Sequence, residues 1–177
     1  MNMHFQDLFI GNLKIEIPIV QGGMGVGVSV SGLVSAVSNA GGLGVIASVG
    51  LDAGGDHTAG DYVARSRSAL ISAIRKTRAM TDKPFGVNIM CALTNYDDLV
   101  DATQQEGVDV IISGAGLPLR LPSLIKNTKT KLFPIVSSAR AAELICSVWQ
   151  RRYKRLPDAL VVEGPLAGGH LGYSREE

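Results

Sequence analysis

Near its end the chain reads Val161-Val162-Glu163-Gly164-Pro165-Leu166-Ala167-Gly168-Gly169-His170-Leu171-Gly172. A short β-branched run leads into a carboxylate, then into a glycine-rich loop, and then to a histidine. Parallel α/β proteins keep their chemistry at strand ends of this kind. Glycine lets backbone N–H groups approach a ligand closely, and histidine can move a proton near neutral pH. The stretch therefore predicts a parallel α/β fold with a functional site at the end of this strand.

The same alternation of strand and helix recurs along the rest of the chain. Helical spacing of apolar residues marks Ala139–Arg151 and Asp61–Met80, and shorter helices are predicted around Leu33–Val37, Tyr96–Thr103 and Leu121–Ile125. Phe5–Ile10 and Leu13–Ile17, joined by Gly11-Asn12, predict a hairpin that caps one end of the fold. The strand runs are apolar throughout, as in parallel sheets buried on both faces. The predicted strands are Ile17–Gln21, Leu43–Ala47, Phe85–Met90, Val108–Ser113, Leu132–Val136 and Ala159–Glu163.

This alternation admits a doubly wound open sheet or a (β/α)8 barrel. The dinucleotide-binding form of the open sheet needs Gly-x-Gly-x-x-Gly and an acidic residue about 20 residues later. In Gly22–Val28 the third glycine is misplaced, and no carboxylate occurs between Glu16 and Asp52. We therefore predict an α/β fold, a parallel TIM-type barrel represented by roughly its first six βα units. Polar residues at successive strand ends, as barrels use them, are Gln21, Asn88, Ser113, Ser137 and Glu163.

Composition excludes several other classes of function. Lys plus Arg number 17 against 16 for Asp plus Glu, so the charge gives no case for nucleic acid or an anionic membrane as partner. Cys91 and Cys146 stand far apart, which argues against a disulfide scaffold or a metal site. The first residues lack the pattern of a signal peptide, and no apolar run reaches the length of a membrane span. We expect a cytoplasmic protein without metal.

Four features could carry chemistry, each with a plainer alternative. His170 could move a proton or hold an anion, or simply bond a backbone carbonyl. Asn88 lies inside an apolar strand, so its amide either pins a neighbouring loop or binds the edge of a planar ligand. Glu163 could contact a ligand or remain solvated. The Gly22–Gly27 turn could be only flexible, or it could lie against a ring face beside Met24.

Ordered motifs add a family resemblance to this pattern. They are Pro18-Ile19-Val20-Gln21-Gly22-Gly23-Met24, Ser38-Asn39-Ala40-Gly41-Gly42-Leu43-Gly44, Pro84-Phe85-Gly86-Val87-Asn88 and the Glu163–Gly172 segment. The chain resembles the nitronate monooxygenase family, formerly the 2-nitropropane dioxygenases. The same flavin-barrel superfamily includes the FMN-dependent enoyl-acyl-carrier-protein reductases. The resemblance covers essentially the whole chain.

The resemblance implies FMN as the cofactor and assigns roles to individual residues. The turn Gly22-Gly23-Met24 would lie against the isoalloxazine ring, and Asn88 would bond the polar edge of the flavin. Glu163 stands where many nitronate monooxygenases have glutamine and where the reductases often have glutamate. The remaining implied residues are Gly168 and Gly169, for backbone contact with the ring, and His170, as the catalytic histidine near flavin N5.

The implied activity is FMN-dependent oxidation of nitronates or nitroalkanes by molecular oxygen. Enoyl-acyl-carrier-protein reduction by NAD(P)H is the alternative, and an inactive fragment is the alternative of another class. Residues 1–177 would form the N-terminal part of one FMN-binding barrel domain, without strands seven and eight. Family members continue into loops that grip the FMN phosphate, so we expect weak flavin binding from the chain alone. Because open sheet edges expose unpaired backbone, we also expect self-association as a homo-oligomer.

Overall fold

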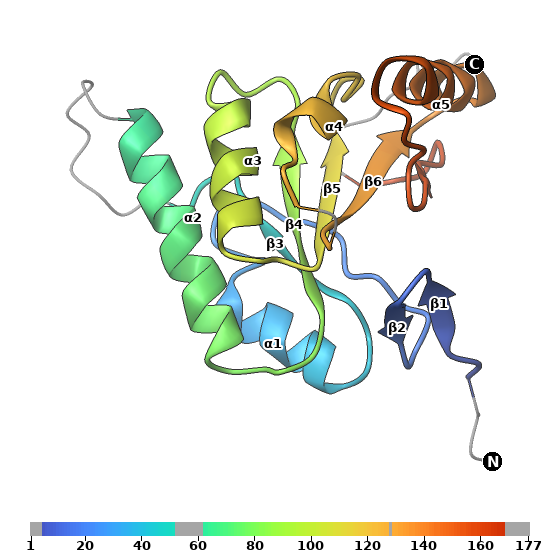
Figure 1. Ribbon diagram of the computed structural model, residues 1–177. Coiled ribbons are helices and arrows are strands. Elements are labelled where there is room, and N and C mark those ends of the chain that lie inside the picture. Colours follow the sequence, from blue (N-terminus) through green and yellow to red (C-terminus); the bar gives the residue numbers. More distant parts are fainter. Residues whose placement is uncertain (1–4, 52–61, 128, 169–177) are drawn as a thin grey trace.

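The computed structural model describes residues 5–51, 62–127 and 129–168. Its centre is a curved parallel sheet whose strands point the same way (Figure 1). The sheet order is β3-β4-β5-β6-β7, so each strand pairs with its neighbours in the sequence. A doubly wound sheet would reverse its strand order at a switch point, whereas a barrel keeps sequential order, and the barrel prediction is confirmed. The strands are β3 Gly44–Ala47, β4 Phe85–Met90, β5 Val110–Gly114, β6 Lys131–Val136 and β7 Val161–Val162.

Helices connect consecutive strands and cover the outer face of the sheet (Figure 1). Every predicted helix is present, with ends shifted by a few residues. The first helix ends at a pair of glycines, where Gly41 has a φ of 95° and Gly42 N–H donates to Val37 O at 3.1 Å. The helices are α1 Ser31–Asn39, α2 Tyr62–Arg78, α3 Tyr96–Gln105, α4 Leu121–Leu124 and α5 Ala139–Tyr153.

Two hydrophobic clusters lie on opposite faces of the sheet. The outer cluster joins the strands to the helices and includes Phe85, Ile111 and Trp149, all fully buried. The inner cluster fills the concave side and includes Val110 and Phe133. Burial on both faces explains why the strand sequences are apolar throughout instead of alternating.

The N-terminal hairpin closes the inner cluster from below. Strands β1 Leu8–Ile10 and β2 Leu13–Ile15 pair antiparallel around a turn in which Gly11 has a φ of 61°. Leu13 and Ile15 pack with the residues of the inner cluster near the amino ends of β5 and β6. The prediction of a capping hairpin is therefore confirmed.

The prediction of a regular first barrel strand is wrong. In place of Ile17–Gln21 the structure has a single parallel bridge between Val20 and Leu43. The segment still bonds to β3 in parallel fashion, with Leu43 N–H donating to Ile19 O at 2.9 Å and Gln21 N–H to Leu43 O at 3.0 Å. It has no strand on its other side among the described residues, and Pro18 has no N–H to donate. Both conditions shorten the ladder.

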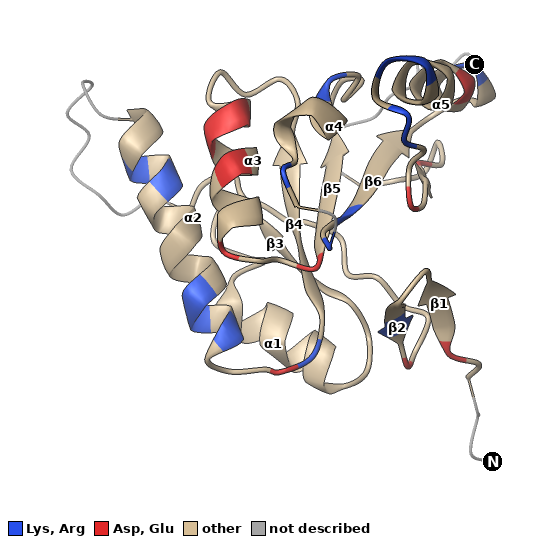
Figure 2. Ribbon diagram, in the orientation of Figure 1, with Lys and Arg blue, Asp and Glu red and all other residues tan. Residues whose placement is uncertain are grey.

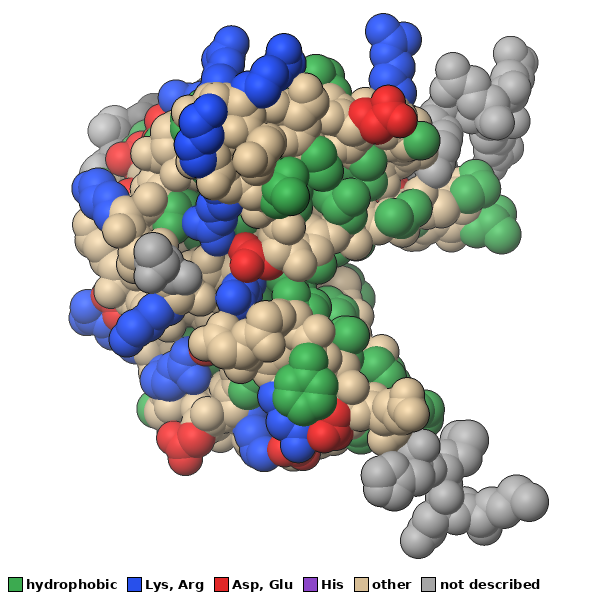
Figure 3. All heavy atoms as spheres, turned by 45° about the vertical axis from the view of Figure 1, so that its right-hand side comes forward, with side chains coloured by type: hydrophobic (Ala, Val, Ile, Leu, Met, Phe, Trp, Pro, Cys, Tyr) green, Lys and Arg blue, Asp and Glu red, His purple; other side chains and the backbone are tan. Residues whose placement is uncertain are grey.

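Between this segment and β7 the molecule is open on one side, and hydrophobic side chains gather along the opening (Figure 3). Strand β7 is shorter than the predicted Ala159–Glu163, and Val162 is 75% exposed on it. Phe9 and Ile19, near the opposite edge, are also more than half exposed. No helix in the described part of the chain is long and apolar enough to cross a membrane.

Candidate active site

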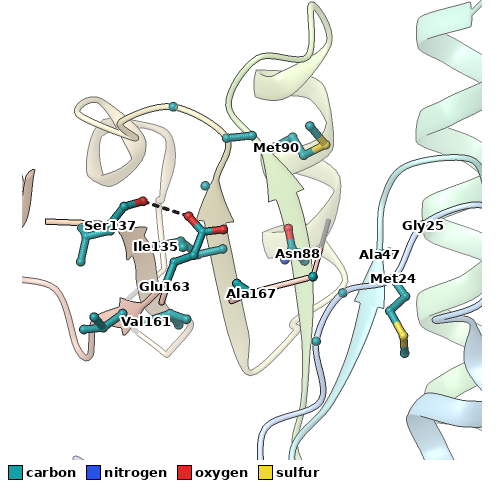
Figure 4. A pocket seen from close by; sticks show the side chains of 18 of the residues that line it. Met24, Gly25, Ala47, Asn88, Met90, Ile135, Ser137, Val161, Glu163 and Ala167 are labelled. Atoms are coloured by element: carbon teal, nitrogen blue, oxygen red, sulfur yellow. Dashed lines mark hydrogen bonds between the residues drawn. The ribbon is translucent and has the colours of Figure 1, made fainter. Parts of the chain in front are cut away.

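A cavity of about 940 Å³ lies at the carboxyl ends of the strands (Figure 4). Each strand of the parallel sheet contributes to its wall, either directly or through the loop that follows. Such convergence is how barrels build one site from many βα loops. The lining segments are 22–25, 47–49, 114–117, 135–138, 161–164 and 167–168, together with Asn88, Met90 and Ala141.

The glycine turn that follows the first segment forms one wall. A Cβ on Gly23 would stand 2.6 Å from the Cβ of Asn88, so no other residue fits there without displacing β4. A Cβ on Gly22 would meet nothing within 4 Å. Met24 lines the same wall and is 45% exposed. Gly23 thus packs directly against the Asn88 side chain, whereas Gly22 leaves backbone surface without a side chain beside the cavity.

Asn88 lies on the cavity side of β4 (Figure 4). Its backbone carbonyl accepts from Ser48 N–H at 3.0 Å, but its side-chain amide makes no hydrogen bond within the described residues. Among the described residues, the amide therefore pins no loop. It offers one acceptor and two donor hydrogens to whatever enters the cavity.

Glu163 and Ser137 meet on the opposite wall. Ser137 Oγ donates to Glu163 Oε2 at 2.9 Å, and Glu163 N–H bonds Val136 O at 2.9 Å, which extends the pairing of β7 beyond its two strand residues. The carboxylate is therefore held at the cavity by a neighbouring strand end (Figure 4). Gly168 also lines the cavity. Gly169 and His170 lie outside the described residues, so their assigned roles stay predictions.

Two of the polar residues expected at the site form hydrogen bonds elsewhere in the protein. Ser113 is fully buried and points toward the helices, where its Oγ lies 2.8 Å from the Tyr96 hydroxyl and bonds Ile89 O. Burial raises the pKa of Tyr96, and burial likewise raises the pKa of the neighbouring Cys91 thiol. This neutral cluster fastens α3 to the sheet. Gln21 is occupied by hydrogen bonds to the protein itself, described below.

Sequence reasoning missed other residues of the wall. Ser48 follows β3 directly, and its buried hydroxyl has no hydrogen-bond partner within the described residues. Met90 and Ile135 supply apolar surface. Ser48 could have been found as the polar residue that ends an apolar strand, the signal that singled out Ser137. No group of metal-binding side chains occurs in the part of the chain that the structure describes.

The family model for nitronate monooxygenase matches residues 6–100 and 91–177. These matches span nearly all of the sequence. The chain belongs to the nitronate monooxygenase family. Its sequential parallel sheet and its cavity at the strand ends agree with that membership.

Individual relatives in this family carry different names. A "(3aS,4S,5R,7aS)-5-hydroxy-7a-methyl-1-oxo-octahydro-1H-indene-4-carboxyl-CoA dehydrogenase" of Mycobacterium tuberculosis is 35% identical over 90% of this chain and 39% of its own length. A nitronate monooxygenase of Pseudomonas aeruginosa is 30% identical over 97% of this chain and 54% of its own length. The chain thus spans from well under half to about half of these relatives.

Solved structures give the same proportions. FabK from Thermotoga maritima superposes with a TM-score of 0.70 at 36% identity, covering 90% of this chain and 44% of that one. Nitroalkane oxidase from Streptomyces ansochromogenes has a TM-score of 0.69 at 24% identity, covering 90% and 50%. The second likeness concerns the fold alone.

Proposed function

We propose that residues 1–177 form the FMN-binding first part of a barrel oxidoreductase that oxidises nitronates or nitroalkanes with molecular oxygen. Membership of the nitronate monooxygenase family supports the reaction class. The observation that carries the cofactor is the Gly22–Met24 turn, which packs against Asn88 and lines the same cavity. The Asn88 amide makes no hydrogen bond within the described residues.

The described residues fit a flavin. A cavity of about 940 Å³ is within the usual size of cofactor sites, roughly 300–1,000 Å³. Gly22 lines the cavity, and a Cβ there would meet nothing within 4 Å, so its open backbone surface suits the face of a planar ring. The Asn88 amide can donate and accept, as the polar edge of an isoalloxazine requires. FMN, when bound, would supply the electron transfer and the oxygen chemistry.

In this proposal the residues of the last loop act on the substrate. His170 would hold an anionic nitronate, or take the proton from the α-carbon of a neutral nitroalkane. Gly168 and Gly169 would bring backbone close to the ring. The partners would be the substrate, oxygen and other copies of the chain in a homo-oligomer, with neither nucleic acid nor membrane involved, in a cytoplasmic protein.

A second candidate is redox chemistry on an acyl thioester, as in FMN-dependent enoyl-acyl-carrier-protein reductases that use NAD(P)H. The observation in its favour is Glu163, whose carboxylate is held at the cavity by Ser137. This is the position at which those reductases often have glutamate and many nitronate monooxygenases have glutamine. The carboxyl-CoA name of the M. tuberculosis relative is consistent with this candidate.

Two measurements on the FMN-loaded protein separate the candidates. Oxygen consumption that depends on an alkyl nitronate, without bleaching of the flavin by NADPH under anaerobic conditions, supports the oxidation. Rapid anaerobic bleaching by NADPH, with no turnover of the nitronate, rejects it in favour of the thioester reaction. A chain that takes up no FMN in a fluorescence titration would leave the third candidate, an inactive fragment or binding module.

A further inference from the structure

The side chains of Gln21 and Ser29 hold the glycine turn closed by hydrogen bonds. Ser29 is 1% exposed, and its Oγ accepts from Met24 N–H at 2.9 Å and from Gln21 Nε2 at 2.7 Å. The same hydroxyl lies 3.2 Å from Gly22 O, and Ser29 N–H donates to Met24 O at 2.9 Å. Both backbone polar groups of Met24 are therefore bound by one serine.

Gln21 also bonds the glycine turn to the sheet. Its Oε1 accepts from Val45 N–H at 3.4 Å, and its Nε2 donates to Val45 O at 3.1 Å. These are the two backbone groups that a longer strand would have bonded at this position. The Gln21 side chain thus makes the hydrogen bonds to β3 that the backbone of a longer strand would make. It links the turn to β3 although the segment forms no further strand residue. We refer to Gln21 and Ser29 as the turn clamp.

The turn clamp decides which polar groups of the turn remain available. The N–H groups of Gly22, Gly23 and Gly25 make no hydrogen bond within the described residues, and all three residues line the cavity. Unpaired backbone N–H groups are costly unless water or a ligand satisfies them. The turn clamp occupies the backbone groups of Met24 and leaves these three glycine donors unbonded, within the described residues, beside the cavity.

Backbone strain shows that the turn does not rest in this shape by itself. Val26 has a φ of 52°, a conformation that β-branched residues rarely adopt. Its N–H donates to Val49 O at 3.3 Å, next to Gly50, where a Cβ would come within 3.0 Å of Val26 N. A strained residue persists where its surroundings hold it, and here the clamp holds one side of the turn.

We propose that Gln21 and Ser29 are positioning residues that hold the glycine turn in its ring-binding shape. They act without touching the ligand, so that the glycine N–H groups are free before the ligand arrives. This inference rests on the proposed flavin site. It adds that the affinity for the flavin ring depends on side chains on the far side of the turn, because prior ordering reduces the cost of binding.

The test uses Ser29→Ala and Gln21→Glu, which removes the Nε2 donations but keeps an acceptor for Val45 N–H. Ser35→Ala is the matched control, because Ser35 is equally buried and its hydroxyl bonds only neighbours outside the turn, Gly32 O and Met80 Sδ. Amide hydrogen exchange at Met24 is measured in the free protein. Dissociation constants for FMN and for lumiflavin, which lacks the ribityl phosphate, are measured by fluorescence quenching.

We expect Met24 exchange to accelerate about tenfold in Ser29→Ala, with the amides of β4 and β5 unchanged. Both flavins should bind about tenfold more weakly to each clamp variant, and to the same extent, since the clamp acts on the ring. Ser35→Ala should leave all three values unchanged.

Unchanged exchange at Met24 in Ser29→Ala overturns the clamp whether or not a flavin binds. Unchanged flavin affinity in both clamp variants, or a loss confined to FMN, overturns its role in ring binding. If the unaltered chain binds neither flavin, the cofactor proposal itself fails, and this result is distinct from the other two.

Discussion

The two ends of the parallel sheet are built on opposite principles. At the amino end, backbone donors are satisfied by aspartates placed just before the following strand. Asp109 accepts from Phe85 N–H at 3.1 Å, and Asp158 accepts from Leu132 N–H at 2.9 Å. Each carboxylate also pairs with an arginine, Arg78 or Arg155, at 3.0 and 2.9 Å. The hairpin then covers the inner cluster beneath them.

At the carboxyl end of the sheet, several polar groups have no such hydrogen-bond partner among the described residues. The amide of Asn88, the hydroxyl of Ser48 and the N–H groups of Gly22, Gly23 and Gly25 have no hydrogen-bond partner among the described residues. They surround a cavity instead of a packed core. Unpaired buried polar groups are costly. Within the described residues, the chain satisfies its polar groups at the amino end and leaves several available to a ligand at the carboxyl end.

Replacing the histidine of the open end should give the largest effect. In the FMN-loaded protein, we expect His170→Asn to lower turnover about 10²- to 10⁴-fold, the usual contribution of a general acid or base. Flavin affinity should stay the same, because the change is at the reacting group. Steady-state kinetics with a nitronate and a flavin titration measure the two quantities. His57→Asn is the control, and equal turnover of the two variants would remove His170 from the mechanism.

Opening the closed end should be the next largest change. Ile15 is 1% exposed in the inner cluster, and truncation of such a residue costs about 2–5 kcal/mol of unfolding free energy. We expect Ile15→Ala to lower the free energy of unfolding by this amount, measured as a lower urea midpoint at an unchanged m-value. Phe9→Ala, in the same hairpin but 62% exposed, should barely move it. Similar midpoints for the two variants would mean that the hairpin does not close the sheet.

Filling the open end should cost less. In Gly23→Ala the new methyl group would stand 2.6 Å from the Cβ of Asn88, and overpacking of this kind costs about 1–3 kcal/mol. Gly22→Ala meets nothing within 4 Å and serves as the control for folding. Thermal unfolding of both variants checks the difference. Equal melting temperatures would show that the turn can move away from β4 without cost.

The smallest effect concerns the outer rim of the closed end. Arg75 on α2 bonds both carboxylate oxygens of Glu106, at 2.8 and 2.7 Å, where basic α2 faces acidic α3 (Figure 2). The hydrogen bond from Arg75 holds the pKa of Glu106 below its usual range. A lowered carboxyl pKa stabilises the fold above the unfolded pKa of about 4.3 and is lost as pH falls through the folded pKa.

We therefore expect Arg75→Ala to lower the melting temperature slightly at pH 7 and not at all at strongly acid pH. Lys76→Ala removes a cation from the same turn of α2 without breaking an ion pair in the described structure. Melting curves across the pH range decide the point. A deficit that persists at the acid end would mean that Arg75 stabilises the protein by packing instead of by charge.

The strand order and the location of the site could be read from the sequence, because both follow from local patterns. Apolar runs separated by helical periodicity predict a parallel sheet, and polar residues after those runs predict a site at its carboxyl edge. Asn88, Ser137 and Glu163 were found in this way, and all three line the cavity. The glycine stop of α1 at Gly41 is equally local.

The face of the sheet to which each strand-end side chain points could not be predicted from the sequence. Successive residues of a strand point to opposite faces, so a shift of one position sends a serine to the helices instead of the cavity. Ser113 is the last but one residue of β5 and faces Tyr96, whereas Ser137 lies just beyond β6 and faces Glu163. Where each strand ends is set by its hydrogen-bonded neighbours, which lie far away in the chain.

Residue types and their spacing are enough to predict a parallel α/β barrel segment, its helices and the glycine-rich edge at the cavity. The folded chain was needed to show that Gln21 completes the ladder of β3 instead of facing a ligand, and that Ser29 binds both backbone groups of Met24. These roles depend on distances between groups that the chain brings together only when the sheet has curved and closed its inner core.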